Sequence, residues 1–129
     1  MSFFNNLFGS TEQENTSKIE WRKLTDLGQL SELTALSFEK PVLIFKHSTR
    51  CSISRFALKQ FENDYDFSSE ELQPYFLDLL ENRSISNEIA LRFDVFHQSP
   101  QILVIKKGKS VYDASHDAIA VSEVRNILN

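Results

Sequence analysis

The chain has 129 residues, which suits one domain with a sizeable hydrophobic core. Its net charge of -4 argues against unaided binding to nucleic acid or to a membrane surface, because both need concentrated lysine and arginine, and no apolar run approaches the length of a membrane span. A single cysteine and the lack of a basic, apolar leader predict a reducing compartment, and hence a cytoplasmic protein.

The N-terminal residues 1–18 are predicted to be a tail, partly ordered at most, ahead of one domain over residues 19–129. Residues 9–18 are polar and show no periodicity. Four apolar residues precede them at helical spacing: Phe3, Phe4, Leu7 and Phe8. A docking helix, for a partner or for the domain itself, is therefore the alternative.

The first half of the domain alternates between predicted strands and helices. A short strand is predicted at residues 21–24, followed by a helix with apolar positions three and four residues apart. Residues 42–45 are uninterrupted and apolar, as in a strand covered on both faces. After the polar turn 47–50, an amphipathic helix is predicted to start at Cys51. Its apolar positions are Ile53, Phe56, Ala57, Phe61 and Tyr65.

The second half continues the alternation and adds a hairpin. Residues 73–80 are predicted as a strand, and Ser84 or Ser86 as the cap of a helix that includes Phe96. An apolar strand follows Pro100 and pairs back through a tight turn, and a helix ends the chain. The order β-α-β-α-β-α-β-β-α predicts a layered α/β domain, with a central mixed sheet of four or five strands and helices on both faces.

Cys51 is predicted to lie at the start of a helix, and this position favours a reactive thiol. The first N–H groups of a helix are unpaired and the helix dipole is positive there, so both favour thiolate over thiol. Arg50 adds a nearby cation. A thiolate stabilised in this way gains little in attack but is a good leaving group, which suits turnover by exchange. The alternative is a buried and inert cysteine, which is common for this residue type.

The motif is a C-x-x-S, with Ser54 in the place of the second cysteine of a C-x-x-C oxidoreductase. A serine cannot close an internal disulfide, and the chain contains no other cysteine. Any disulfide of Cys51 must therefore involve another molecule.

Other reactive side chains form weaker patterns. A Cys–His hydrolase is a minor alternative, because no oxyanion hole or orienting group accompanies the histidines. No metal site is expected, since one cysteine and three scattered histidines lack ligand spacing. Lys46 either lies behind Cys51 and biases its charge, or sits at the strand end and extends to solvent. His97 is either a solvated loop residue or a minor contributor to substrate binding.

Four segments keep a distinctive order and spacing: residues 45–54 around the cysteine, residues 75–80, residues 86–90, and residues 97–101 with the sequence His-Gln-Ser-Pro-Gln. Together they resemble the monothiol bacilliredoxins, which are thioredoxin-like proteins linked to the low-molecular-weight thiol bacillithiol. The resemblance covers about residues 19 to 128. Family members usually carry Cys-Pro-Ile-Ser, and here Ser52 replaces the proline.

This resemblance implies a thioredoxin-like fold in which Pro100 is cis and faces Cys51. It also implies removal of bacillithiol, or a similar thiol, from mixed disulfides of client proteins, with Cys51 as the catalytic residue and no tightly bound cofactor. Arg50, Ser54 and the backbone beside Ser99 and Pro100 are then the candidates for substrate binding. The alternatives are a non-catalytic thioredoxin-like binding module and a redox sensor capped at Cys51.

Overall fold

The computed structural model describes residues 19–129, so the predicted tail of residues 1–18 lies outside the described part of the chain. The described residues follow the predicted order of strands and helices, with one 3₁₀ turn added. The elements are β1 (Arg22–Lys23), α1 (Gly28–Leu36), β2 (Val42–His47), α2 (Ser52–Asp64), β3 (Gln73–Asp78), α3 (Arg83–Phe93), β4 (Gln101–Lys106), β5 (Lys109–Ser115), η2 (His116–Ala118) and α4 (Val121–Leu128).

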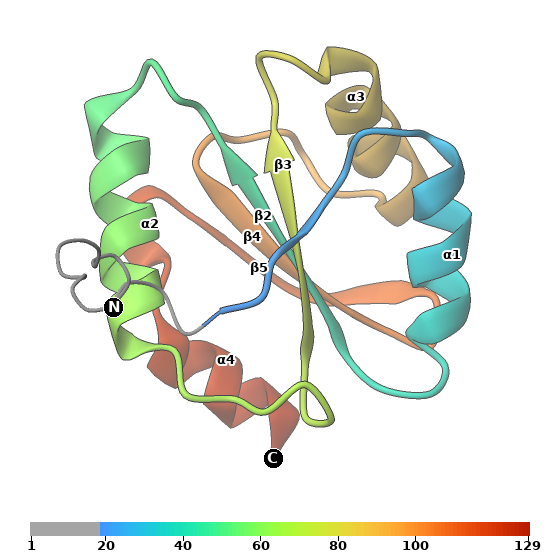
Figure 1. The fold of residues 1–129 in the computed structure, drawn as a ribbon. Helices are drawn as coiled ribbons and strands as arrows, with labels where there is room; N and C mark the ends of the chain where they lie inside the picture. The colour runs from blue at the N-terminus through green and yellow to red at the C-terminus, as the bar shows by residue number, and fades with distance from the viewer. Residues whose placement is uncertain (1–18) are drawn as a thin grey trace, which may run out of the picture.

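The strands form one mixed sheet in the order β1-β3-β2-β4-β5. β2 lies at its centre, parallel to β3 and antiparallel to β4, and all of its residues are buried. This agrees with the prediction of a strand covered on both faces. The register pairs Lys46 of β2 with Gln101 of β4, so the end of β2 and the start of β4 meet at the same edge of the sheet. α2 begins at that edge (Figure 1).

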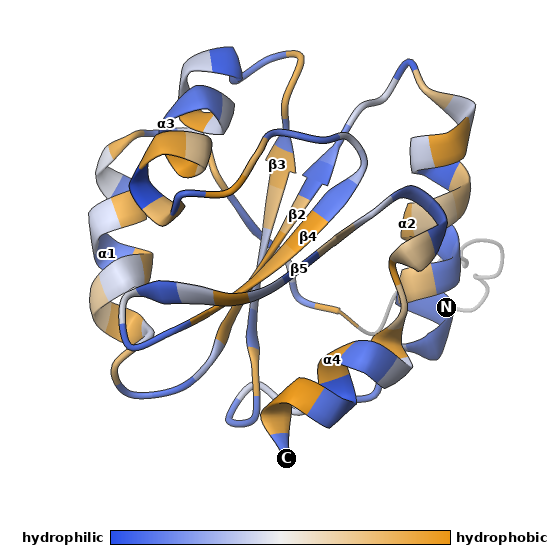
Figure 2. Ribbon diagram, turned by 180° about the vertical axis from the view of Figure 1, so that it is seen from behind, coloured by the Kyte–Doolittle hydropathy of each residue, from blue (hydrophilic) through white to orange (hydrophobic). Residues whose placement is uncertain are grey.

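Helices cover both faces of the sheet, as predicted: α1 and α3 lie on one face, and α2 and α4 on the other (Figure 1). The two faces of the sheet each carry a hydrophobic core, and alternate residues of β2 pack into one or the other. Val42 and Ile44 pack toward α1 and α3, whereas Leu43 and Phe45 pack toward α2 and α4. Figure 2 shows hydrophobic residues along β3, β2 and β4, and an α4 that alternates between the two colours. The same alternation directs Lys46 toward the face of α1 and α3.

α3 starts earlier than the sequence predicts. Its cap position is occupied by Asn82, so neither Ser84 nor Ser86 is the cap. The turn after β3 closes on the Asp78 carbonyl, which accepts the Asn82 N–H at 3.1 Å, and the helix then begins at Arg83. Ser86 is consequently buried inside α3.

Gly108 closes the hairpin between β4 and β5, and we expect it to be intolerant of a side chain. Its φ of 80° lies in the left-handed region, and a Cβ would meet the ring of Phe38 at 3.2 Å. Gly108→Ala should therefore lower the free energy of unfolding by about 1–2 kcal/mol, measured by urea denaturation. The matched control is Lys109→Ala at the next, exposed position, with an expected change below about 0.5 kcal/mol. Equal midpoints for the two variants would contradict this expectation.

Candidate functional site

Cys51 lies at the edge where β2 ends and α2 begins. Its backbone is extended, with φ −107° and ψ 120°, and its carbonyl accepts the Arg55 N–H at 3.0 Å, so it occupies the N-cap position of α2. The preceding turn is closed by the Cys51 N–H, which donates to the Ser48 carbonyl at 3.2 Å. The structure thus places the thiol-bearing residue at a helix start, as the sequence predicts.

The positive end of α2 is not neutralised by the helix itself. The N-cap residue makes no side-chain capping hydrogen bond, and the first turn contains no acidic residue. The first N–H groups of a helix and its dipole both favour negative charge at this position. Arg50 is exposed and forms no ion pair with residues 19–129. Because Cys51 is partly exposed, a thiolate favoured by this field is also within reach of a reagent.

Ser54, the last residue of the C-x-x-S motif, is fully buried. Its Oγ accepts the Ser48 N–H at 3.0 Å and shares a hydrogen bond of 2.7 Å with Nδ1 of His47. The hydroxyl therefore fastens the turn before Cys51 to the first turn of α2. The family resemblance makes Ser54 a candidate for substrate binding. In this geometry its hydroxyl is already hydrogen-bonded and lies away from the surface, so its observed contacts are with the turn.

His47 is buried beside that turn. Its ring packs against Phe45 and Phe76, with ring centroids 6.5 and 5.4 Å away. Burial lowers the pKa of His47; the Asp78 carboxylate opposes this shift, and the Arg55 guanidinium adds to it. No hydrogen bond among the described residues joins this imidazole to the cysteine. A neutral ring held in this way supports the turn and offers no base for a Cys–His hydrolase.

The Ser99–Pro100 peptide bond is cis, and Pro100 is buried next to the end of β2. Its carbonyl accepts the His116 N–H at 3.1 Å, and η2, which His116 begins, lies against α2. The loop is thereby tied to the helix that Cys51 caps. Proline has no N–H, so within the described chain only Ser99 of this dipeptide keeps a free backbone N–H and C=O. Its Oγ is buried without a hydrogen-bond partner among residues 19–129.

Lys46 does not extend to solvent, which corrects one of its two predicted placements. The side chain is fully buried, and Nζ lies 2.9 Å from Nδ1 of His97. Ser86 Oγ lies 3.4 Å from the same nitrogen. The physical reason is that α3 and the loop before β4 cover the end of β2 on the face toward which Lys46 points.

The pair of Lys46 and His97 has a defined charge. An ammonium group has only donors, so Nδ1 of His97 accepts and the ring carries its proton on Nε2. Burial lowers the pKa of Lys46 from 10.5 to about 8. Burial also lowers the pKa of His97, and the charges of Lys46 and Arg83 lower it further. At pH 7 a charged lysine therefore stands behind a neutral histidine.

Three apolar side chains at this edge are exposed rather than buried. Ile53 and Phe56 of α2 are 58% and 73% exposed, and Phe96, in the loop after α3, is 88% exposed. The prediction that they belong to the apolar faces of helices is wrong. The buried line of α2 runs through Ser54 and Phe61, and Phe56 lies about 140° around the helix from Phe61. Phe96 lies beyond the end of α3 altogether.

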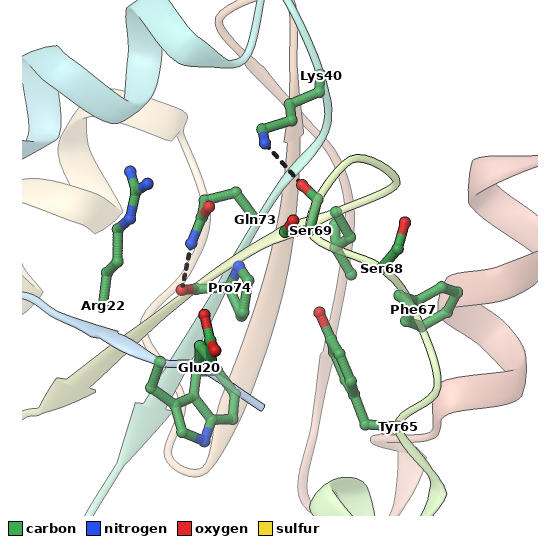
Figure 3. A pocket seen from close by; sticks show the side chains of 11 residues that line it. Glu20, Arg22, Lys40, Tyr65, Phe67, Ser68, Ser69, Gln73 and Pro74 are labelled. Carbon is green, nitrogen blue, oxygen red and sulfur yellow. Dashed lines mark hydrogen bonds between the residues drawn. The ribbon is translucent and has the colours of Figure 1, made fainter. Parts of the chain in front are cut away.

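A separate cavity of about 590 Å³ lies at the opposite end of the sheet (Figure 3). It is lined by the start of β3, the segment before β2 and the loop after α2. Inside it, Lys40 Nζ donates to the Ser69 carbonyl at 2.6 Å, and the Gln73 amide donates to the Pro74 carbonyl at 3.2 Å. The length of β2, about 20 Å at the rise of a strand, separates this cavity from Cys51. It is therefore no part of the site around the cysteine.

Within residues 19–129, no group of three or more His, Cys, Asp or Glu side chains is placed to hold a metal ion. The helices of this part of the chain are too short or too polar to cross a bilayer.

The chain matches the model of the monothiol bacilliredoxin BrxC over residues 22–124. It belongs to the monothiol bacilliredoxin family. The match confirms the resemblance that the four sequence segments indicate. Thiol–disulfide exchange in general is the chemistry of a bacilliredoxin.

Solved structures confirm the thioredoxin fold of this bacilliredoxin. A presumed oxidoreductase with a thioredoxin fold has a TM-score of 0.70 at 29% identity, over 84% of this chain and 93% of its own. The thioredoxin Mala s 13 of Malassezia sympodialis has a TM-score of 0.67 at 16% identity, over 92% of this chain and 96% of its own. Fasciola hepatica thioredoxin has a TM-score of 0.62 at 19% identity, over 83% and 95% respectively.

Proposed function

We propose that this bacilliredoxin removes bacillithiol, or a similar low-molecular-weight thiol, from mixed disulfides of client proteins. The observation that carries the proposal is the position of Cys51, the chain's only cysteine, at the uncapped N-terminus of α2 in a member of this family. A lone thiol in that position supports exchange with a partner molecule and excludes an internal disulfide.

The reaction consists of two thiol–disulfide exchanges, and the number of disulfide bonds is unchanged in each. In the first, the Cys51 thiolate attacks the bacillithiol sulfur. The client–bacillithiol bond breaks, a Cys51–bacillithiol bond forms, and the client leaves as a thiolate. In the second, the thiolate of another thiol attacks the bacillithiol sulfur of this adduct, and Cys51 leaves as a thiolate. The uncapped end of α2 favours the negative charge on Cys51 before the first step and after the second.

The client docks beside the loop that carries Ser99. The free backbone N–H and C=O of Ser99 support one strand-like pair of hydrogen bonds with an extended client segment. Exposed Ile53, Phe56 and Phe96 supply apolar surface at the same edge. Arg50, next to the cysteine, offers its unpaired charge to an anionic group of the incoming mixed disulfide.

The test offers a bacillithiolated client protein to the wild type and to Cys51→Ser, with the intact mass of both partners followed over time. The wild type is expected to gain one bacillithiol as the client loses one. Cys51→Ser should slow this transfer at least about 10³-fold, because a serine hydroxyl is a weak nucleophile at its free pKa. Lys59→Ala, an exposed change on the same helix, serves as the control and should keep the wild-type rate.

Full transfer by Cys51→Ser would overturn the proposal. A stable adduct on Cys51 that no second thiol releases would instead indicate a redox sensor. Client binding without any transfer would indicate a non-catalytic binding module.

A further inference from the structure

A buried positive charge without a negative partner lies beneath the site. Lys46 has no exposed surface, and no carboxylate among residues 19–129 lies within ion-pair distance of its Nζ. Buried charges in proteins are normally paired, because an unpaired ion is costly to remove from water. The one hydrogen bond of Nζ within the described chain goes to Nδ1 of His97. The buried ammonium group of Lys46 therefore lowers the stability of the fold, so stability does not account for a lysine at this position.

His97 connects this charge to the surface. Its ring is exposed although Nδ1 is held by the buried ammonium group, so the N–H that a ligand meets is on Nε2. Hydrogen-bonded groups in a chain polarise one another, and a donor backed by an ammonium group is stronger than an isolated imidazole. Arg83, the first residue of α3, acts electrostatically on the same ring. The outer edge of His97 is thus suited to an anion.

This donor lies at the same end of the sheet as Cys51, where a small molecule attached to the thiol would be held. The turn from Ser48 to Cys51 is closed by a hydrogen bond, and Lys46 stands two residues before that turn. The Cα atoms of Lys46 and Cys51 are therefore at most about 14 Å apart. His97 lies in the loop that leads to Pro100, which the register of β4 places at this edge. A low-molecular-weight thiol of tripeptide size spans about 10 Å when extended.

We propose that Lys46 and His97 form an anion subsite that recognises a carboxylate of the low-molecular-weight thiol. The Nε2–H of His97 donates to the carboxylate, and Lys46 is the positioning residue that fixes the tautomer and supplies the charge. A carboxylate fits because it only accepts hydrogen bonds, whereas the subsite only donates them. The inference rests on the proposed function, since it names the chemical class of thiol that Cys51 exchanges.

The experiment compares two caps that differ only by a carboxylate. One client peptide is prepared as its mixed disulfide with the tripeptide N-acetyl-Cys-Gly-Gly and, separately, with the C-terminal amide of the same tripeptide. The wild type is expected to accept the acid cap about tenfold faster, the usual effect of one charge-assisted hydrogen bond. Lys46→Met and His97→Phe should reduce this ratio to below about 2 by slowing the transfer of the acid cap. Lys109→Met, on the distant hairpin, should keep the wild-type ratio.

Each outcome has a distinct meaning. Equal acceptance of both caps by the wild type would overturn the subsite and leave the proposed function intact. A uniform loss of rate with both caps in Lys46→Met would show that the lysine supports only the fold, and would also overturn it. No transfer from either cap or from bacillithiol would overturn both proposals. A second pair of peptides, with Asp or Asn beside the capped cysteine, tests whether the recognised carboxylate belongs to the cap or to the client. A rate that depends on Asp and not on the carboxylate of the cap would assign the recognised group to the client and overturn the subsite.

Discussion

Replacing Lys46 with methionine is expected to raise the free energy of unfolding at pH 7 by about 2 kcal/mol, even though we assign the lysine to the site. The lysine is buried and charged at that pH, and burial lowers its pKa from 10.5 to about 8. Methionine has similar length and no charge to desolvate. The difference in the free energy of unfolding between the wild type and the variant should shrink as the pH rises. Above pH 8 the lysine of the folded chain releases its proton, whereas the unfolded chain keeps this proton until pH 10.5. The wild type therefore gains about 2 kcal/mol between pH 7 and pH 9.5 from this group.

Urea denaturation at the two pH values, followed by the fluorescence of the single tryptophan, measures the difference. The series should stop at pH 9.5. Burial raises the pKa of Tyr65, so the titration of this tyrosine lowers the free energy of unfolding at higher pH and would oppose the effect of Lys46. Lys109→Met is the matched control, since Lys109 is exposed. A Lys46→Met variant that is less stable than the wild type at pH 7 would show that the contact with His97 outweighs the desolvation of the ammonium group.

Ser54→Cys is expected to convert the monothiol site into a dithiol site. Residues three positions apart face each other at the start of a helix, with Cβ atoms about 5–6 Å apart, which is close enough for a disulfide after a small shift. The new thiol would attack the sulfur of Cys51 in the adduct, release the small thiol and leave an internal disulfide. Loss of the adduct without added thiol should accelerate at least about 100-fold, because the attack is intramolecular. Intact mass shows it as loss of one molecule of the thiol from the adduct, which leaves the protein two hydrogens lighter than its fully reduced form.

Ser52→Cys is the matched control for this conversion, because adjacent residues on a helix do not face each other. Its adduct should persist as in the wild type. Ser54→Cys should also lower the stability by about 1–3 kcal/mol, since the Ser48 N–H and the His47 ring lose their shared hydroxyl partner. Equal lifetimes of the two adducts would show that the buried position of residue 54 prevents the attack.

The fold and the place of Cys51 could be predicted because they depend on local patterns. The apolar run of β2 and the polar turn after it fix where the cysteine falls, and the alternating elements fix the layers. The cap position of α3 could not be predicted, because asparagine is as favourable at an N-cap as the two serines that follow Asn82. The exposed Ile53 and Phe56 were assigned to the helix face because the polar Ser54, which marks the buried line of α2, interrupts the apolar pattern.

The partnership of Lys46 and His97 could not be predicted, because it depends on which loop covers the end of β2. The two residues are 51 positions apart, and neither carries a motif that links it to the other. One signal was present: a lysine that continues an apolar central strand is directed inward by strand alternation. Ser86 and Arg83, which complete its surroundings, lie on a helix whose rotation the sequence leaves open.

The hydrogen bond between the Pro100 carbonyl and the His116 N–H has a consequence for client range. With that carbonyl occupied, Ser99 is the member of the Ser99–Pro100 pair that keeps a free backbone N–H and C=O. Under the function proposed above, hydrogen bonds to this backbone add no selectivity for the side chains that flank the capped cysteine of a client. A panel of capped peptides with unrelated flanking sequences should accordingly be processed at similar rates.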